Sequence, residues 1–79
     1  MKLIRIGKVS ERALVGRINR KLWKDQEILR RCAERSRGFQ TLGRYYIVDS
    51  HSGIIDMDVD LENLGRKMGA LQQTEALAG

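Results

Sequence analysis

The chain has 79 residues, with 15 Lys and Arg against 10 Asp and Glu, which gives a formal net charge of +5. Domains usually contain about 100–150 residues, so a chain of this length forms one small domain with no room for a large enzyme cleft. Its single Cys excludes an internal disulfide framework, and also zinc sites built from four Cys or from two Cys and two His.

The apolar stretches of the chain are short. None approaches the roughly 20 apolar residues of a membrane span. Charged residues interrupt the N-terminus, unlike in a signal peptide. We therefore expect a cytoplasmic protein without a membrane partner.

Charge is unevenly divided along the chain. Residues 1–44 contain 13 basic and four acidic residues, a balance of +9, whereas residues 45–79 contain two basic and six acidic residues, a balance of −4. Such asymmetry is typical of a protein that binds a polyanion or an electrostatically complementary protein.

The first half predicts an arm or edge strand at 1–8, then a helix over about 10–23. Ser10 is a good N-cap. Leu14, Val15, Ile18 and Leu22 recur on one helical face, which predicts the side that faces the core. Residues 25–35 fit either a second helical face or a strand, and we favour a strand after a turn near Asp25.

The second half predicts a loop, a hairpin and a helix. Residues 34–43 are rich in Gly and polar residues, which indicates a loop. The β-favouring run from Tyr45 and a turn at 50–53 predict a hairpin over 45–59, with Ile55, Met57 and Val59 facing inward.

A second helix is expected over about 60–69, with Asp60 as its N-cap. Its apolar face comprises Leu61, Leu64, Met68 and Leu71. Residues 72–79 are expected to be a frayed tail, so that the domain spans residues 1–71.

Together these elements predict an α+β fold: a small three-stranded antiparallel sheet packed against two helices. The predicted core is thin. A homodimer would let two copies share apolar surface, and we keep this as a hypothesis.

A basic surface is the first candidate site. Arg binds phosphate oxygens through a planar fork, and an exposed aromatic ring beside such cations stacks on unpaired bases. A solvated helix face on a basic protein is the alternative explanation. The candidate nucleic-acid-binding residues are Arg12, Arg17, Arg20, Lys21, Trp23, Lys24, Arg30, Arg31, Arg35 and Arg37.

An acidic strand is the second candidate site. Asp56, Asp58 and Asp60 begin like a calcium-binding loop, but Leu61 replaces the required Gly and Lys67 stands where the bidentate Glu belongs. We therefore expect no metal and interpret the three carboxylates as a solvated or partner-facing surface.

Catalytic chemistry has little support. His51 lies in a predicted turn without the strained elbow that holds a catalytic Ser. Cys32 has arginines beside it but fits a small buried core residue. We expect a protein that is not an enzyme and that uses no cofactor.

Three runs, at residues 16–22, 45–49 and 59–66, give the chain a resemblance over about residues 10–71 to short uncharacterised proteins carried by bacterial plasmids and phages. The resemblance implies a context only, and no site residue carries over from it. Small proteins of such elements often bind nucleic acid or block host defence complexes, such as restriction or CRISPR machinery.

The leading hypothesis is a small protein that binds DNA or RNA and contacts the phosphates through its basic helix and loop. The alternative is an inhibitor or adaptor that binds an acidic or nucleic-acid-binding protein complex, through either the acidic strand or the basic helix.

Overall fold

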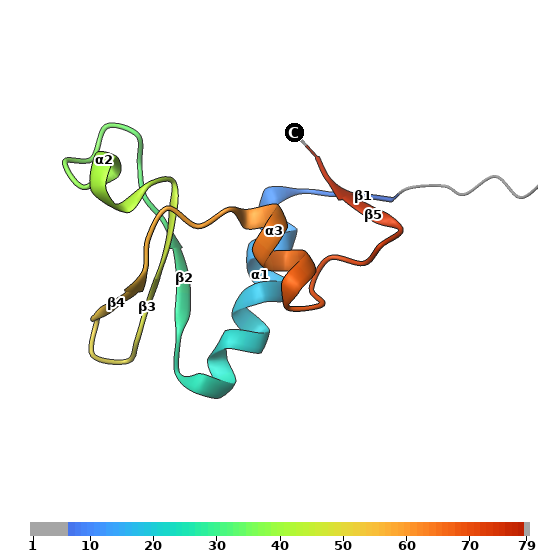
Figure 1. The fold of residues 1–79 in the computed structure, drawn as a ribbon, viewed down its shortest axis with the longest axis horizontal. Coiled ribbons are helices and arrows are strands. Elements are labelled where there is room, and N and C mark those ends of the chain that lie inside the picture. The colour runs from blue at the N-terminus through green and yellow to red at the C-terminus, as the bar shows by residue number, and fades with distance from the viewer. Residues whose placement is uncertain (1–6, 79) are drawn as a thin grey trace, which may run out of the picture.

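The computed structural model describes residues 7–78 as a mixture of short helices and strands (Figure 1). In chain order the elements are β1 (Gly7–Val9), α1 (Glu11–Leu22), the 3-10 helix η1 (Trp23–Asp25), β2 (Ile28–Arg31), α2 (Phe39–Leu42), β3 (Tyr45–Val48), β4 (Ile54–Asp56), α3 (Leu61–Lys67) and β5 (Glu75–Leu77). The expected α+β class is confirmed.

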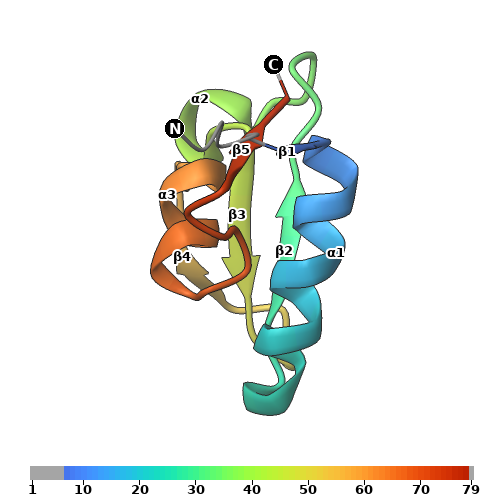
Figure 2. The same ribbon diagram turned by 90° about the vertical axis from the view of Figure 1, so that its right-hand side faces the viewer.

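The strands form two sheets. β2, β3 and β4 make a three-stranded antiparallel sheet in that order, as the sequence predicts. β1 and β5 form a separate parallel pair (Figure 2). Residues 1–6 of the expected N-terminal arm lie outside the described residues, and its last two residues begin β1.

Helix α1 begins and packs as expected. The Ser10 hydroxyl accepts a hydrogen bond from the backbone N–H of Ala13 at 3.1 Å, which satisfies one of the free donors of the first turn. Leu14, Ile18 and Leu22 are buried along one face.

The ambiguous segment after α1 is a strand, in agreement with the favoured interpretation. Gln26 adopts a left-handed conformation (φ 57°) and ends η1. β2 then runs back along α1, and Leu29 is buried opposite Ile47 of β3. A helix through residues 25–35 is therefore excluded.

Two details of residues 34–59 differ from the expectation. The predicted loop contains the short helix α2, whose last residues bond back to Gly38 and Phe39. Ile55 and Met57 are exposed rather than inward, because the register shifts between Ile47 and Val48 and the strand ends at Asp56.

Helix α3 follows its predicted cap. The Asp60 carboxylate accepts a hydrogen bond from the Asn63 N–H at 3.1 Å. Leu61 is buried, and α3 contacts α1 where the buried Gly65 lies against Leu14. A side chain at residue 65 would hold the two helices apart, so glycine permits this close approach.

The C-terminal segment contains the strand β5, where a frayed tail over 72–79 was expected; residue 79 lies outside the described residues. β5 pairs in parallel with β1, and flanking backbone bonds join Gly7 to Thr74 at 2.8 Å and Ala78 to Val9 at 2.7 Å. This pairing satisfies backbone groups that a frayed end would leave to water.

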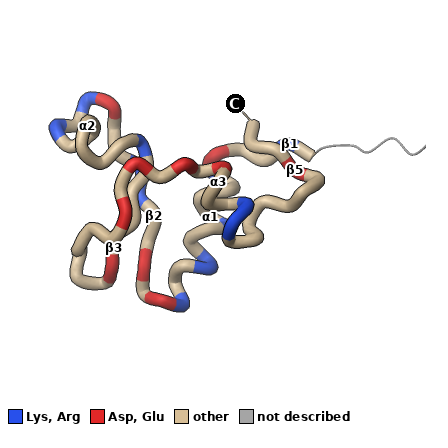
Figure 3. The backbone as a smooth tube through the Cα atoms, viewed as in Figure 1, with Lys and Arg blue, Asp and Glu red and all other residues tan. Residues whose placement is uncertain are grey.

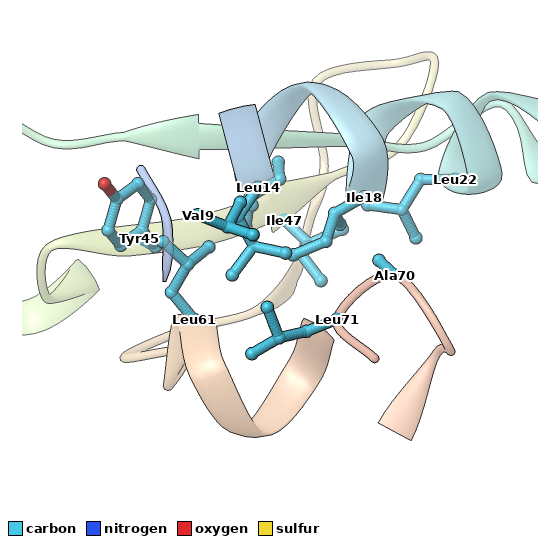
Figure 4. Close-up of a cluster of buried hydrophobic side chains, with 10 residues drawn as sticks. Val9, Leu14, Ile18, Leu22, Tyr45, Ile47, Leu61, Ala70 and Leu71 are labelled. Carbon is cyan, nitrogen blue, oxygen red and sulfur yellow. The ribbon is translucent and has the colours of Figure 1, made fainter. Parts of the chain in front are cut away.

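One cluster of buried side chains joins both helices to the sheet (Figure 4). Its members are Val9, Leu14, Ile18, Leu22, Leu29, Tyr45, Ile47, Leu61, Ala70 and Leu71. Packing of both helices on the same face of the sheet stays a prediction. Within residues 7–78, no helix has the length and apolar character needed to cross a bilayer.

Candidate functional site

The ten residues of the predicted basic surface do not form one patch. Lys and Arg occur along α1 and in the loop before α2 (Figure 3). That loop lies at the top of the molecule and η1 at the bottom in Figure 2.

Four of the ten residues lie together in a groove of about 510 Å³, here called the α1 groove. Arg17, Arg20, Lys21 and Lys24 line it from α1 and η1. Its other wall is the turn after α3, formed by Gly69, Ala70 and Gln72. The helical spacing of the four cations explains why they share one side of α1.

Arg17 is committed to the fold rather than free for a ligand. Its guanidinium donates to both carboxylate oxygens of Glu75, at 2.8 and 3.0 Å, and to the backbone oxygen of Ala70 at 3.2 Å. The hydrogen bond from Arg17, followed by that from the backbone N–H of Gln72, holds the pKa of Glu75 below its ordinary value. Arg17 therefore fixes the wall of the groove.

The other three cations of the α1 groove carry unbalanced charge. Arg20, Lys21 and Lys24 are exposed, and within residues 7–78 no acidic side chain lies within 4 Å of their charged groups. Residues 20 and 24 are separated by about 6 Å along the helix axis. Three positive charges at this spacing make the groove attractive to a multivalent anion.

Trp23 and Arg30 belong to a different groove, of about 470 Å³, between η1 and the sheet. It is lined by Trp23, Gln26, Glu27, Ile28, Arg30, Val48, Asp49, Ser50 and Ser52. Trp23 is 72% exposed, which agrees with its expected place among the surface residues. The apolar walls of this groove and its two carboxylates, Glu27 and Asp49, distinguish it from the α1 groove.

The remaining basic residues are spread over the surface. Arg12 is exposed on α1 outside the groove, and Arg35 and Arg37 are exposed in the loop before α2. Arg31 pairs with Tyr45 across β2 and β3. The structure thus brings together four of the ten predicted residues and disperses the others.

One arrangement was not anticipated from the sequence. The Tyr45 hydroxyl donates to Glu11 at 2.7 Å, and Arg44 lies 3.6 Å from the same carboxylate. Burial, then the hydrogen bond and negative charge of Glu11, raise the pKa of Tyr45. Nothing in the local pattern pairs residue 11 with residues 44 and 45, which are distant in sequence.

The three predicted acidic residues share a third groove of about 260 Å³, here called the acidic groove, whose lining includes Met57, Asn63, Leu64 and Lys67. Asp60 caps α3, and Asp56 accepts from the N–H of Met57 at 2.9 Å. Asp58 is exposed with a left-handed backbone (φ 51°). Within the described part of the chain, no three His, Cys, Asp or Glu side chains form a metal-binding group.

Cys32 and His51 lie where the sequence predicts, at a buried position and in a turn. Cys32 is buried at the end of β2. His51 is exposed in the β3–β4 turn, where its backbone N–H donates to the Asp49 carboxylate at 2.9 Å. This bond and one from Gly53 lower the pKa of Asp49, that from Gly53 having the larger effect.

Comparison with protein families, with curated proteins and with solved structures found no match to this chain.

Proposed function

We propose that this protein binds nucleic acid without catalysing a reaction, and that the α1 groove is its phosphate-binding site. The observation that carries the proposal is the grouping of Arg20, Lys21 and Lys24 in one groove, where no acidic side chain of residues 7–78 lies within 4 Å of their charged groups. Lys and Arg supply most protein contacts to phosphate oxygens, and these contacts determine affinity more than sequence preference.

The α1 groove is also held in place by the fold. Arg17 bonds Glu75 and Ala70, and Arg66 donates to the backbone oxygens of Gln72 and Glu75, at 3.3 and 3.1 Å. These contacts fix the turn opposite α1. A phosphate that enters the groove therefore meets cations on a preformed surface.

A salt titration tests the proposal. Labelled DNA duplex, single-stranded DNA and RNA are titrated with the protein at about 50 and about 200 mM salt. If three phosphates are neutralised, the affinity for duplex DNA falls by about 40-fold between these concentrations, since the log–log slope is about −0.9 per phosphate. Absence of binding to all three probes at the lower concentration overturns the proposal.

Two charge-matched variants locate the site. Arg20→Glu with Lys24→Glu reverses two charges in the α1 groove, whereas Arg35→Glu with Arg37→Glu makes the same change in net charge at the other end of the molecule. We expect the first pair to weaken binding by more than 10-fold and the second by much less. Equal losses would show that binding follows net charge rather than the groove.

A second candidate function is a protein-interaction inhibitor or adaptor. It is favoured by the grouping of Asp56, Asp58 and Asp60 in one groove, because a row of carboxylates complements a protein surface that binds nucleic acid. The resemblance to proteins of mobile elements would make a host defence complex the target. In this case the chain would block an interaction rather than bind nucleic acid itself.

Variants of the two grooves separate these functions. A host lysate is passed over the immobilised protein and over two variants, Asp56→Lys with Asp58→Lys and Arg20→Glu with Lys24→Glu. Nuclease treatment removes partners that are held through nucleic acid. Nuclease-resistant capture that only the acidic-groove variant abolishes would support the second function and contradict the first.

A further inference from the structure

The sheet formed by β2, β3 and β4 has one face in the core and one face turned away from it. Leu29 and Ile47 are opposite each other in the register, and both belong to the buried cluster. Side chains alternate between the two faces of a sheet. The neighbouring register positions therefore lie on the other face.

That other face, here called the outer sheet face, carries a row of apolar side chains. Ile28 pairs with Val48, and Val48 pairs with Ile54, so the row crosses all three strands. Arg30 pairs with Tyr46 beside it. Trp23 lines the same groove as Ile28, Arg30 and Val48, which places its ring at the margin of this face.

This surface is more apolar than a solvated sheet face requires. Trp23 is 72% exposed, Ile54 is 52% exposed and Ile28 is 36% exposed, whereas Val48, which pairs with both isoleucines, is 7% exposed. Single exposed apolar residues are ordinary, but a contiguous group indicates an interaction surface. Aromatic residues and Arg are enriched at the centre of protein interfaces. Trp23, Tyr46 and Arg30 give the outer sheet face this composition.

Charge favours a protein over a nucleic acid as the occupant. Glu27 and Asp49 line the groove together with Arg30, so two carboxylates accompany one guanidinium. Phosphates would be repelled by these carboxylates. A second copy of the chain, related by a two-fold axis, presents the same carboxylates and guanidinium in the opposite orientation. Arg30 of each copy is then able to approach the carboxylates of the other copy.

From these observations we infer that the outer sheet face is the interface of a homodimer. The inference is independent of the proposed nucleic-acid site, because the α1 groove is lined by other residues. Burial of the apolar row removes it from water, which is the main driving force for association. In such a dimer each protomer keeps its own α1 groove.

The test is the molecular mass of the protein in the absence of nucleic acid. Sedimentation equilibrium from about 1 to about 200 µM spans the range of ordinary protein affinities. We expect conversion from a 9.0 kDa chain to twice this mass. Trp23 is the sole Trp, so its fluorescence emission reports burial of this face directly and shifts to shorter wavelength over the same concentration range.

Two exposed apolar residues provide a matched pair of variants. Ile54→Lys adds a charge in the apolar row, whereas Met57→Lys makes the same kind of change at a residue that is 47% exposed and lines the acidic groove. We expect Ile54→Lys to weaken dimerisation by at least 10-fold and Met57→Lys to weaken it little. Circular dichroism of both variants verifies that each is folded.

Three results would overturn the inference. The first is a monomer at about 200 µM, well above the Kd expected of a specific interface. The second is a dimer whose dissociation constant is the same in folded Ile54→Lys and Trp23→Ala as in the unmodified chain. The third is quenching of Trp23 by single-stranded oligonucleotide on a monomeric protein, which would assign this face to unpaired bases. None of these results depends on whether phosphates bind the α1 groove.

Discussion

Asn19 of α1 pairs with Leu29 of β2 through both backbone polar groups of the leucine. The side-chain oxygen of Asn19 accepts from the Leu29 N–H at 2.7 Å, and its amide donates to the Leu29 C=O at 3.3 Å. An Asn side chain thus takes the place of a neighbouring strand at the edge of the sheet. It also fixes the position of α1 along β2.

Asn19→Ala is expected to reduce the free energy of unfolding by about 1–3 kcal/mol, because it leaves a partly buried N–H and C=O without partners. Asn19→Asp keeps the acceptor but replaces the donor by a carboxylate oxygen that faces the Leu29 C=O, so it should destabilise as well. Urea denaturation measures both. The control is Asn63→Ala, an exposed residue on α3, whose effect should lie within about 0.5 kcal/mol. Equal values for both Ala variants would contradict the role of Asn19.

Two helix glycines should respond to Ala in opposite directions. A methyl group at Gly65 would lie 2.9 Å from Leu14 Cδ1 and 3.3 Å from Leu71 Cβ, whereas nothing lies within 4 Å of one at Gly16. We expect Gly65→Ala to destabilise by about 1–3 kcal/mol through overpacking. Gly16→Ala should stabilise by about 0.5–1 kcal/mol through helix propensity. Thermal unfolding of both variants measures the contrast, and a stabilising Gly65→Ala would be the contrary result.

The ion pair between Arg17 and Glu75 predicts an acid-sensitive C-terminal segment. Because the pKa of Glu75 is lowered in the folded chain, its contribution to stability is present above the ordinary glutamate pKa and is lost as the pH falls through the lowered value. Glu75→Gln should remove this dependence. Thermal unfolding of the two proteins between pH 3 and pH 6 tests it, with the NMR titration of the Glu75 carboxyl as a direct measure. Parallel pH profiles would disprove the prediction.

Tyr45 predicts a loss of stability in alkali. Its raised pKa means that its contribution is complete below the ordinary tyrosine value of about 10 and is lost as the pH rises above it. The Tyr46→Phe variant leaves one tyrosine, so that ultraviolet titration reports Tyr45 alone. Midpoints should be higher in the folded protein than in denaturant. Tyr45→Phe should cost about 1 kcal/mol, the usual value for one hydrogen bond.

The helices were predictable because their signals are local. Ser10 and Asp60 bond the third residue that follows each of them, and the apolar face of α1 repeats within three turns. Ile55 could not be placed correctly, because the register shift that exposes it depends on contacts with another strand. Apolar and acidic residues do alternate within 54–59, but a register shift of one residue exchanges the side chains between the two faces of the sheet.

The candidate sites were predictable only as residue types. Sequence spacing groups Arg20, Lys21 and Lys24 because they follow one another at helical intervals through α1 and η1. It could not separate Arg17, whose partner Glu75 is 58 positions away. It also could not separate Trp23 and Arg30 from the α1 cations, since that division depends on how β2 folds back along the helix.

The parallel pairing of β1 with β5 has a consequence for the order of events during synthesis. Gly7 and Glu75 are register partners, so this strand pair closes after nearly all of the intervening chain has left the ribosome. Until then Ala70 and Leu71 are absent from the cluster that contains Ile18. Translation adds about 5–20 residues per second, and the apolar side of α1 stays partly uncovered while residues 68–77 are made. Until β5 pairs with β1, the nascent chain therefore exposes apolar surface of α1 to aggregation and proteolysis.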